Sequence, residues 1–435
     1  MKKLWDKGQS LDADIEAFTI GQDRELDLRL APYDVLASKA HAQMLCKVGL
    51  LTQAEWQQLA PAFDVLYEEV QQPGFKLDEG VEDIHSQLEG MLTARLGEVG
   101  KKIHSGRSRN DQVLVALALY YRAAVNQLRA NLAALVSSLL DAAEKHQGHL
   151  MPGYTHMQTA MPSSFAQWFA GHAENLLNDL EQSEGVLQYL GRNPLGSGAG
   201  YGTSFPLDRA FTAELLGFNG LHYNAIAAQY SRGKNERLLT QWLAELAHGL
   251  GRLAMDICLY NGQEFRFFVL PDAFTTGSSI MPHKKNPDVW ELLRGHANRL
   301  QALPNEVRLL TSNLPTGYHR EFQLLKEAVF PAIDRMEALL FIAKKGVEVL
   351  QVRPNILQDP LYQSVFTVEA VNARVLQGQS FRDAYRSVAA EVSDGTFSWK
   401  AELQHSHAGS IGDVGMDVLR KRLVASVDIE QSKAL

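Results

Sequence analysis

The most constraining feature of this sequence is a long run without helix-breaking residues. Residues 112–147 contain neither proline nor glycine, and apolar side chains recur there at the three- and four-residue spacing of a helix. At 1.5 Å per residue such a helix is about 54 Å long, several times the length of an average helix. Because a rod of this length needs packing partners along its whole length, the run predicts a helical bundle.

Further long runs with apolar residues at helical spacing follow, whereas alternating, strand-like segments are nearly absent. We therefore predict an all-α protein built around long helices, one of which should bend or break at Pro331. The run at 235–261 is apolar around most of its circumference, and one chain can hardly bury several such rods. The pattern therefore also predicts a homo-oligomer. The further runs are 163–190, 235–261, 288–312 and 320–350.

Composition argues against several classes of protein. The 435 residues are 46% hydrophobic, which is too apolar for intrinsic disorder, and 42 Lys and Arg against 50 Asp and Glu give a net charge of −8. A mildly acidic chain lacks the positive field that nucleic-acid binding needs. Because no stretch of 18 residues avoids polar side chains, we expect no membrane span.

Cysteine usage and the N-terminal segment predict the compartment. Cys46 and Cys258 each lie in an apolar helical pattern, and we interpret them as free thiols in a reducing environment. The segment 1–18 begins with two adjacent lysines, Lys2 and Lys3, but has no apolar run behind them, so it does not resemble a secretory signal. We expect a cytoplasmic protein.

Changes in composition along the chain suggest three domains. A polar, glycine-containing stretch precedes the longest rod, and charge rises beyond the last one. We expect an N-terminal domain over 1–108, a central helical bundle over 109–352 and a small C-terminal domain over 353–435.

Four short polar segments interrupt the apolar pattern and could carry chemistry. They are 82–85, 105–112, 153–158 and 277–287. The last combines glycine, two serines, two lysines and two prolines. A serine there could act as nucleophile or base among positive charges and backbone N–H groups. The same residues could equally form a solvated loop that caps a helix at Asp288, and both interpretations stay open.

The other polar segments are less specific on their own. Arg107 and Arg109 beside Asn110 suit a carboxylate ligand near a helix N-terminus, but would also fit an ordinary helix start. His156 is a natural proton carrier, yet a lone histidine is more often structural. His85, beside Asp83, could likewise be structural, and Glu291 could be an ordinary surface residue.

Two patterns point away from cofactors and metals. The glycine-rich stretch 196–202 is not preceded by a strand, so a dinucleotide site is not expected there. Neither CxxC nor HExxH occurs, and His405 with His407 is too sparse a pair for a metal site. We expect neither a metal nor an organic cofactor.

Taken together, the polar segments resemble the fumarase/aspartase superfamily of fumarate-releasing lyases. Residues 277–287 read GSSIMPHKKNP and resemble its GSSxMPxKxNP loop. Residues 105–112, SGRSRNDQ, and 151–162, MPGYTHMQTAMP, narrow the resemblance to the argininosuccinate lyase family. The similarity extends roughly from 18 to 330 and weakens after about 351.

This resemblance implies a fold, an assembly and a reaction. The family has three α-helical domains and forms a homotetramer around a core of about 20 helices. Its active sites are each built from three subunits. It cleaves argininosuccinate to arginine and fumarate by anti elimination, without a cofactor, in arginine biosynthesis.

The resemblance also implies roles for individual residues. Ser278 matches the base that removes a proton from the succinyl carbon, and Lys284 and Asn286 match the residues that stabilise the resulting charge. His156, held by Glu291, matches the pair that protonates the leaving guanidinium group. The remaining matches are substrate-contacting positions: Arg109, Asn110, Thr155, Tyr318, Gln323 and Lys326, more loosely Thr19, and Asp83 and His85 lining the site.

Two segments depart from the family pattern. The family's YNxDLQEDKE reads YHREFQLLKE at 318–327, and its SDRDF reads YSRGK at 230–234. Both lie where the amino-acid end of the substrate would bind. The alternatives are therefore a sister lyase acting on another N-succinyl compound, with adenylosuccinate the weaker version, and a catalytically silent homologue.

Overall fold

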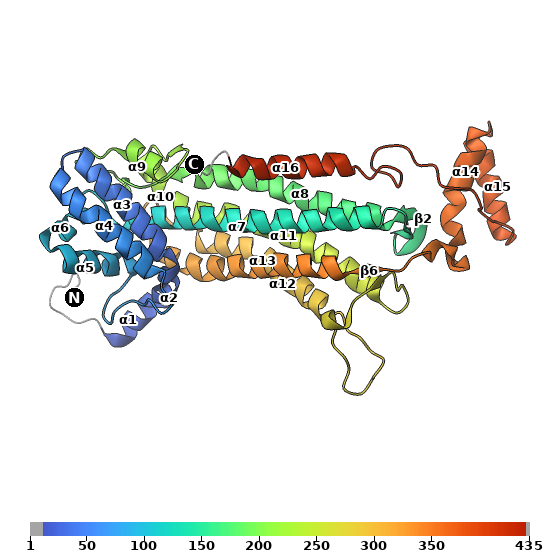
Figure 1. The fold of residues 1–435 in the computed structure, drawn as a ribbon, viewed down its shortest axis with the longest axis horizontal. Coiled ribbons are helices and arrows are strands. Elements are labelled where there is room, and N and C mark those ends of the chain that lie inside the picture. The colour runs from blue at the N-terminus through green and yellow to red at the C-terminus, as the bar shows by residue number, and fades with distance from the viewer. Residues whose placement is uncertain (1–11, 432–435) are drawn as a thin grey trace.

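The structure is a computed structural model that describes residues 12–431 (Figure 1). Residues 1–11 lie outside this range. They make up most of the segment 1–18, which does not resemble a secretory signal. The described chain is dominated by helices, and its strands form three two-stranded pairs. The prediction of an all-α protein is confirmed.

Five long helices form the central bundle (Figure 1). They correspond closely to the predicted rods, because a continuous apolar stripe on each one packs against its neighbours in one core. The helix across Pro331 is continuous rather than broken. The bounds are α7 Arg109–Lys145, α8 Phe165–Leu190, α11 Ser231–Asn261, α12 Asp288–Leu310 and α13 Leu324–Val349.

The start of α7 shows how the local sequence determines where a helix of the bundle begins. Ser108 adopts an extended backbone and its hydroxyl caps the helix, while Asp111 reaches back to the Ser108 backbone N–H to complete a capping box. The predicted helix start at residue 112 is therefore three residues late. The shift matters because it places Arg109 and Asn110 in the first helical turn.

A separate group of shorter helices with its own apolar core lies at the N-terminal end of α7 (Figure 1). Its principal members are α3, α4 and α5, and α9 and α10 lie close by. The bounds are α1 Ala13–Ile20, α2 Asp23–Asp27, α3 Ala31–Lys47, α4 Gln53–Val70, α5 Ile84–Leu96, α6 Glu98–Lys101, α9 Arg209–Leu215 and α10 Ala225–Gln229.

The C-terminal part of the chain divides between two places (Figure 1). Helices α14 (Thr367–Leu376) and α15 (Phe381–Ser393) pack on each other beyond the far end of the bundle, with a small core of their own. Helix α16 (Met416–Gln431) returns along α7 and α8. The domain boundaries at 108/109 and 352/353 stay predictions.

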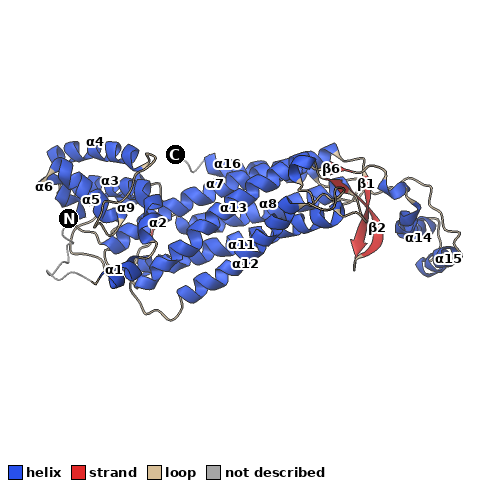
Figure 2. Cartoon of the chain, turned by 90° about the horizontal axis from the view of Figure 1, so that it is seen from below, coloured by secondary structure: helices blue, strands red, loops and turns tan. Residues whose placement is uncertain are grey.

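The strands lie mainly at the far end of the bundle (Figure 2). A hairpin of β1 (Leu150–Thr155) and β2 (Gln158–Ser164) connects α7 to α8. The short strands β5 (Phe268–Val269) and β6 (Gln351–Val352) pair nearby, and β3 (Arg192–Asn193) pairs with β4 (Gly220–Leu221).

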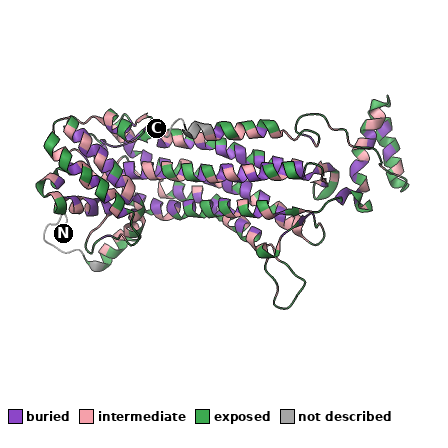
Figure 3. Cartoon of the chain, in the orientation of Figure 1, coloured by how far each residue is buried: buried purple, intermediate pink, exposed green. Residues whose placement is uncertain are grey.

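Burial follows the helix faces, with purple inner stripes and green outer stripes along the rods (Figure 3). Within residues 12–431, none of the helices combines the length and the apolar character that a membrane crossing requires. Cys46 and Cys258 are both half-buried free thiols, as predicted.

Candidate active site

A polar cavity of about 190 Å³ lies where the N-terminal helices meet the bundle. It brings together seven of the residues that sequence analysis identified, although they come from three distant parts of the chain. The predicted residues in its lining are Asp83, His85, Arg109, Asn110, Tyr318, Gln323 and Lys326. The cavity also contains Glu82, from the polar segment 82–85, and residues that sequence analysis missed, namely Asp23, Asp27, Arg232 and Arg320.

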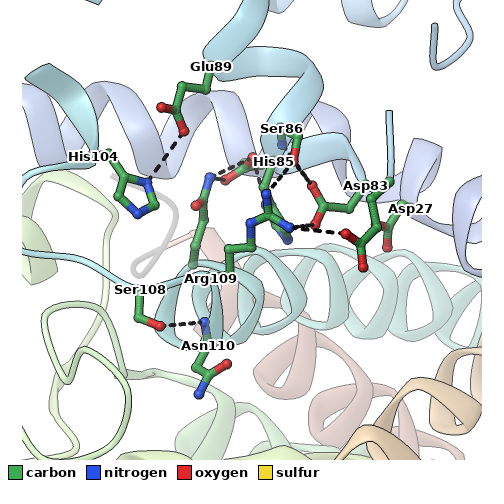
Figure 4. A network of polar contacts seen from close by, with 12 residues as sticks. Asp27, Asp83, His85, Ser86, Glu89, His104, Ser108, Arg109 and Asn110 are labelled. Atoms are coloured by element: carbon green, nitrogen blue, oxygen red, sulfur yellow. Dashed lines mark hydrogen bonds and ion pairs between the residues drawn. The ribbon is translucent and has the colours of Figure 1, made fainter. Parts of the chain in front are cut away.

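The first side of the cavity is formed where α5 and α7 begin (Figure 4). The carboxylate of Asp83 caps α5 by accepting the Ser86 backbone N–H at 2.8 Å, and it also accepts a bond from Arg109 Nη1 at 2.8 Å. Arg109 Nη2 donates to Ser86 Oγ at 2.7 Å. Burial pushes the pKa of Asp83 up, but His85 and Arg109 outweigh it and the pKa is lowered. Arg109 is therefore held rigidly at the cavity wall.

A second side is formed by the segment that precedes α13 and by the first turn of that helix. Lys326 is buried and its ammonium group lies 2.5 Å from Asp27 Oδ1, with Asp23 as a second partner. Burial raises the pKa of Asp23 in spite of the nearby Lys326 ammonium group. Gln323 donates to the backbone carbonyl of Thr19 at 3.2 Å. The Thr19 hydroxyl instead donates to the Ile15 carbonyl at 2.9 Å.

The predicted catalytic residues lie at the other end of the bundle (Figures 1 and 2). His156 and Thr155 are exposed at the tip of the β1–β2 hairpin, beyond the C-terminal end of α7. Ser278, Lys284 and Asn286 lie in the loop that leads into α12, and Glu291 is exposed in the first turn of that helix. Since α7 has 37 residues, its two ends are about 55 Å apart.

Local geometry shapes both catalytic segments. His156 and Met157 have φ of 53° and 60°, the left-handed conformations that a two-residue hairpin turn requires. In the loop, Thr276 and Asn286 pair through their backbones, and Ser278 Oγ accepts the Met281 backbone N–H at 3.1 Å. Within the described chain no hydrogen bond or ion pair joins His156 to Glu291, and this predicted pair stays a prediction.

Two sequence features have structural explanations. Arg107 does not line the cavity but is buried and donates to Ser38 Oγ at 2.8 Å. The glycine-rich stretch presents the backbone N–H groups of Gly196 and Gly198, but Asp111 Oδ2 accepts both at 2.9 Å. The chain's own carboxylate thus occupies the place of an anionic ligand.

The missed cavity residues carried only weak sequence signals. Asp23 and Asp27 are spaced four residues apart, which reads as an ordinary polar helix face. Arg232 lies in the segment 230–234, one of the two that depart from the family pattern. It is part of a kink at the start of α11, where Gly233 has a φ of 85°. Across residues 12–431, no group of three or more histidine, cysteine or acidic side chains is arranged to hold a metal ion.

Comparisons with known proteins show which family this chain is similar to. A family model described as lyase matches residues 9–302. Argininosuccinate lyase of Parabacteroides distasonis is 46% identical over 99% of this chain and 97% of its own length, and that of Thermotoga neapolitana is 40% identical over 89% and 98%.

Solved structures show the same fold at low sequence identity. EDDS lyase in complex with formate is 24% identical, with a TM-score of 0.70 over 98% of this chain and 90% of its own. Class II fumarase from Schistosoma mansoni is 18% identical, with a TM-score of 0.72 over 88% and 91%. The resemblance inferred from the polar segments is thereby confirmed: this chain belongs to the argininosuccinate lyase family of the fumarase/aspartase superfamily.

Proposed function

We propose that this protein is a carbon–nitrogen lyase that cleaves argininosuccinate to arginine and fumarate in arginine biosynthesis. The observation that carries the proposal is the convergence of seven family-matched residues from three parts of the chain on one polar cavity. Relatives that are 40–46% identical over most of their length and carry this name support it.

The proposed reaction begins at the catalytic loop. Ser278, deprotonated, removes a proton from the succinyl carbon next to a carboxylate, and the electron pair moves into that carboxylate. Lys284 and Asn286 stabilise the added negative charge. The electron pair then returns to form the carbon–carbon double bond of fumarate while the bond from carbon to the guanidine nitrogen breaks. His156 supplies a proton to the departing guanidine.

This chemistry requires that different subunits share each site. The hairpin lies at the far end of α7, about 55 Å from the cavity of its own chain, and the loop precedes α12, whose 23 residues span about 35 Å. Antiparallel neighbours would bring the hairpin of one chain and the loop of another to this cavity. Both segments carry exposed apolar side chains, Met157 at 67% and Ile280 at 83%, as expected of surfaces that a partner covers. The proposed assembly is a homotetramer with sites built from three subunits.

The first test is a turnover assay on the purified protein. Fumarate release is followed by ultraviolet absorbance, with argininosuccinate and adenylosuccinate run side by side. Fumarate from argininosuccinate alone supports the proposal. Turnover of adenylosuccinate alone would assign the chain to a sister lyase, and turnover of neither by an assembled oligomer would indicate a silent homologue.

A mixing experiment tests the shared site. Ser278→Ala disables the catalytic end and Asn110→Leu disables the cavity end, where Asn110 lines the wall in the first turn of α7. The two inactive variants are unfolded together and refolded at equal amounts. If each site takes the two residues from different chains, roughly a quarter of wild-type activity returns. If one chain supplied both, the mixture would stay inactive.

The compartment is proposed on separate grounds. Two half-buried cysteines that remain unpaired fit a reducing environment, and we place the protein in the cytoplasm. A measurement of free thiols in the freshly isolated protein, with two expected per chain, checks this assignment.

A further inference from the structure

His85 is one end of a buried polar chain that runs from the protein interior to the cavity. Its Nδ1 lies 2.9 Å from Asp34 Oδ2, and Asp34 is completely buried on α3. Gln112, from α7, donates to both oxygens of Asp34 at 3.0 and 3.1 Å. Because three helices contribute to this chain, the imidazole ring has a fixed orientation.

The other ring nitrogen of His85 is available to a ligand. His85 lines the cavity, and Nε2 has no hydrogen-bond partner in the part of the chain that the structure describes. A purely structural buried histidine normally satisfies both nitrogens. Here one nitrogen is held by the interior and the second is left for whatever fills the cavity.

The charges around His85 favour the protonated ring. Burial by itself would lower the pKa of His85, but the carboxylates of Asp34, Asp83 and Asp27 outweigh it and raise the pKa. The basic groups nearby are already engaged, because Arg109 bonds Asp83 and Lys326 bonds Asp27. Arg107, the cation that acts on Asp34, bonds Ser38.

His41 shows that burial does not decide the charge state. It is also fully buried, and burial together with the nearby Arg107 lowers its pKa to about 3. The two histidines differ in the sign of the neighbouring charge. Asp34 thus favours the protonated ring of His85, in which both nitrogens donate, whereas the neutral ring is favoured at His41.

We propose that Asp34 is a positioning residue which holds His85 as an imidazolium, so that Nε2–H donates to a carboxylate oxygen of the dicarboxylate half of the substrate. This inference rests on the proposed lyase function and adds to it a residue outside the cavity wall. The bond to a charged donor would be among the stronger contacts of the site.

The test measures inhibition by fumarate, the dicarboxylate product, at pH 6 and pH 8. Asp34→Asn keeps an oxygen that can accept from Nδ1 but removes the charge, so the pKa of His85 falls. As the pH rises, the ring in the variant should lose its proton before the wild-type ring does, so fumarate inhibition of the variant should weaken at lower pH. Once its ring is neutral, fumarate should bind about tenfold more weakly than to wild type. The alkaline limb of kcat/KM should move to lower pH in parallel.

The matched control is a carboxylate–histidine pair outside the cavity. Glu369 lies 3.0 Å from His405 Nε2, and neither residue lines the cavity. Glu369→Gln should leave both the fumarate inhibition and its pH dependence unchanged. Should Asp34→Asn fail to fold, His85→Asn gives the same information, because the pH dependence of fumarate binding should disappear with the ring.

The failures of the two proposals are distinguishable. If wild type releases no fumarate from argininosuccinate, the lyase function is wrong. If wild type is active but Asp34→Asn shows the wild-type fumarate affinity and pH limb, the assignment of Asp34 is wrong. The same holds if His85→Asn retains the wild-type pH dependence.

Discussion

Lys326 and Asp27 form an ion pair in the interior, with 2.5 Å between the ammonium nitrogen and the carboxylate oxygen. Both side chains are only 3% exposed, and Asp23 is a second acidic partner of the same lysine. The pair joins α2 to α13 across the cavity. It therefore couples the integrity of the site to the attachment of the N-terminal helices.

Replacing Lys326 with methionine should lower the stability of the protein as well as its turnover. The change leaves two carboxylates without their cation, and breaking a buried ion pair costs about 3–5 kcal/mol. Urea unfolding measures the loss. Lys326→Met/Asp27→Asn should recover part of the stability without recovering turnover, and a double variant as unstable as the single one would contradict this explanation.

Ser278→Ala should lower kcat by about a thousandfold or more, because the proton-abstracting group is lost. Ser278 is half-buried in a loop, and among residues 12–431 its hydroxyl accepts only backbone N–H groups of that loop, so the thermal unfolding temperature should not change. Ser279→Ala is the matched control in the same loop. Loss of turnover in Ser279→Ala but not in Ser278→Ala would transfer the role to the neighbouring serine.

His41 should make the protein sensitive to mild acid. Burial and Arg107 lower the pKa of the folded-state ring to about 3, against a usual value near 6.5. The unfolded chain therefore takes up a proton first as pH falls below about 6.5, and the associated stability is lost progressively towards pH 3. Between pH 6.5 and 5 the loss should be about 2 kcal/mol.

His41→Gln tests this pH dependence. Glutamine can keep a hydrogen bond to the Ser105 carbonyl, which His41 Nε2 approaches to 2.8 Å, but it does not titrate. The slope of unfolding free energy between pH 6.5 and 5 should decrease in the variant. An unchanged slope would mean that another group causes the acid sensitivity.

Gly233→Ala should distort the kink at the start of α11. Gly233 has a φ of 85°, and an added Cβ would lie 2.7 Å from Thr311 Cγ2. The backbone strain alone costs about 1–3 kcal/mol. Because the preceding Arg232 lines the cavity, KM for argininosuccinate should rise as well.

Gly251→Ala is the control for this substitution. Gly251 lies in the same helix without a positive φ, and an added Cβ would meet Ala297 Cβ at an ordinary 3.6 Å. Alanine favours a helix over glycine by up to about 1 kcal/mol, so this variant should be as stable as wild type or more so. Equal destabilisation of both variants would exclude the kink as the cause.

Much of the secondary structure was predictable because it depends on neighbouring residues. The absence of glycine and proline from 112–147, together with apolar spacing, determines that this segment is a helix whatever surrounds it. The motif in the 277–287 loop likewise depends on residues that are adjacent in sequence. These local patterns were enough to identify the rods and the family, and they predict which segments are catalytic.

The composition of the cavity depended on tertiary structure. His85 meets Asp34 across 51 positions, and Lys326 meets Asp27 across 299. Helical periodicity tells which face of a rod is buried but not which rod it packs against. Asp34 and Asp27 therefore looked like ordinary acidic residues in the sequence. Only long-range packing placed them, buried, beside the imidazole of His85 and the ammonium group of Lys326.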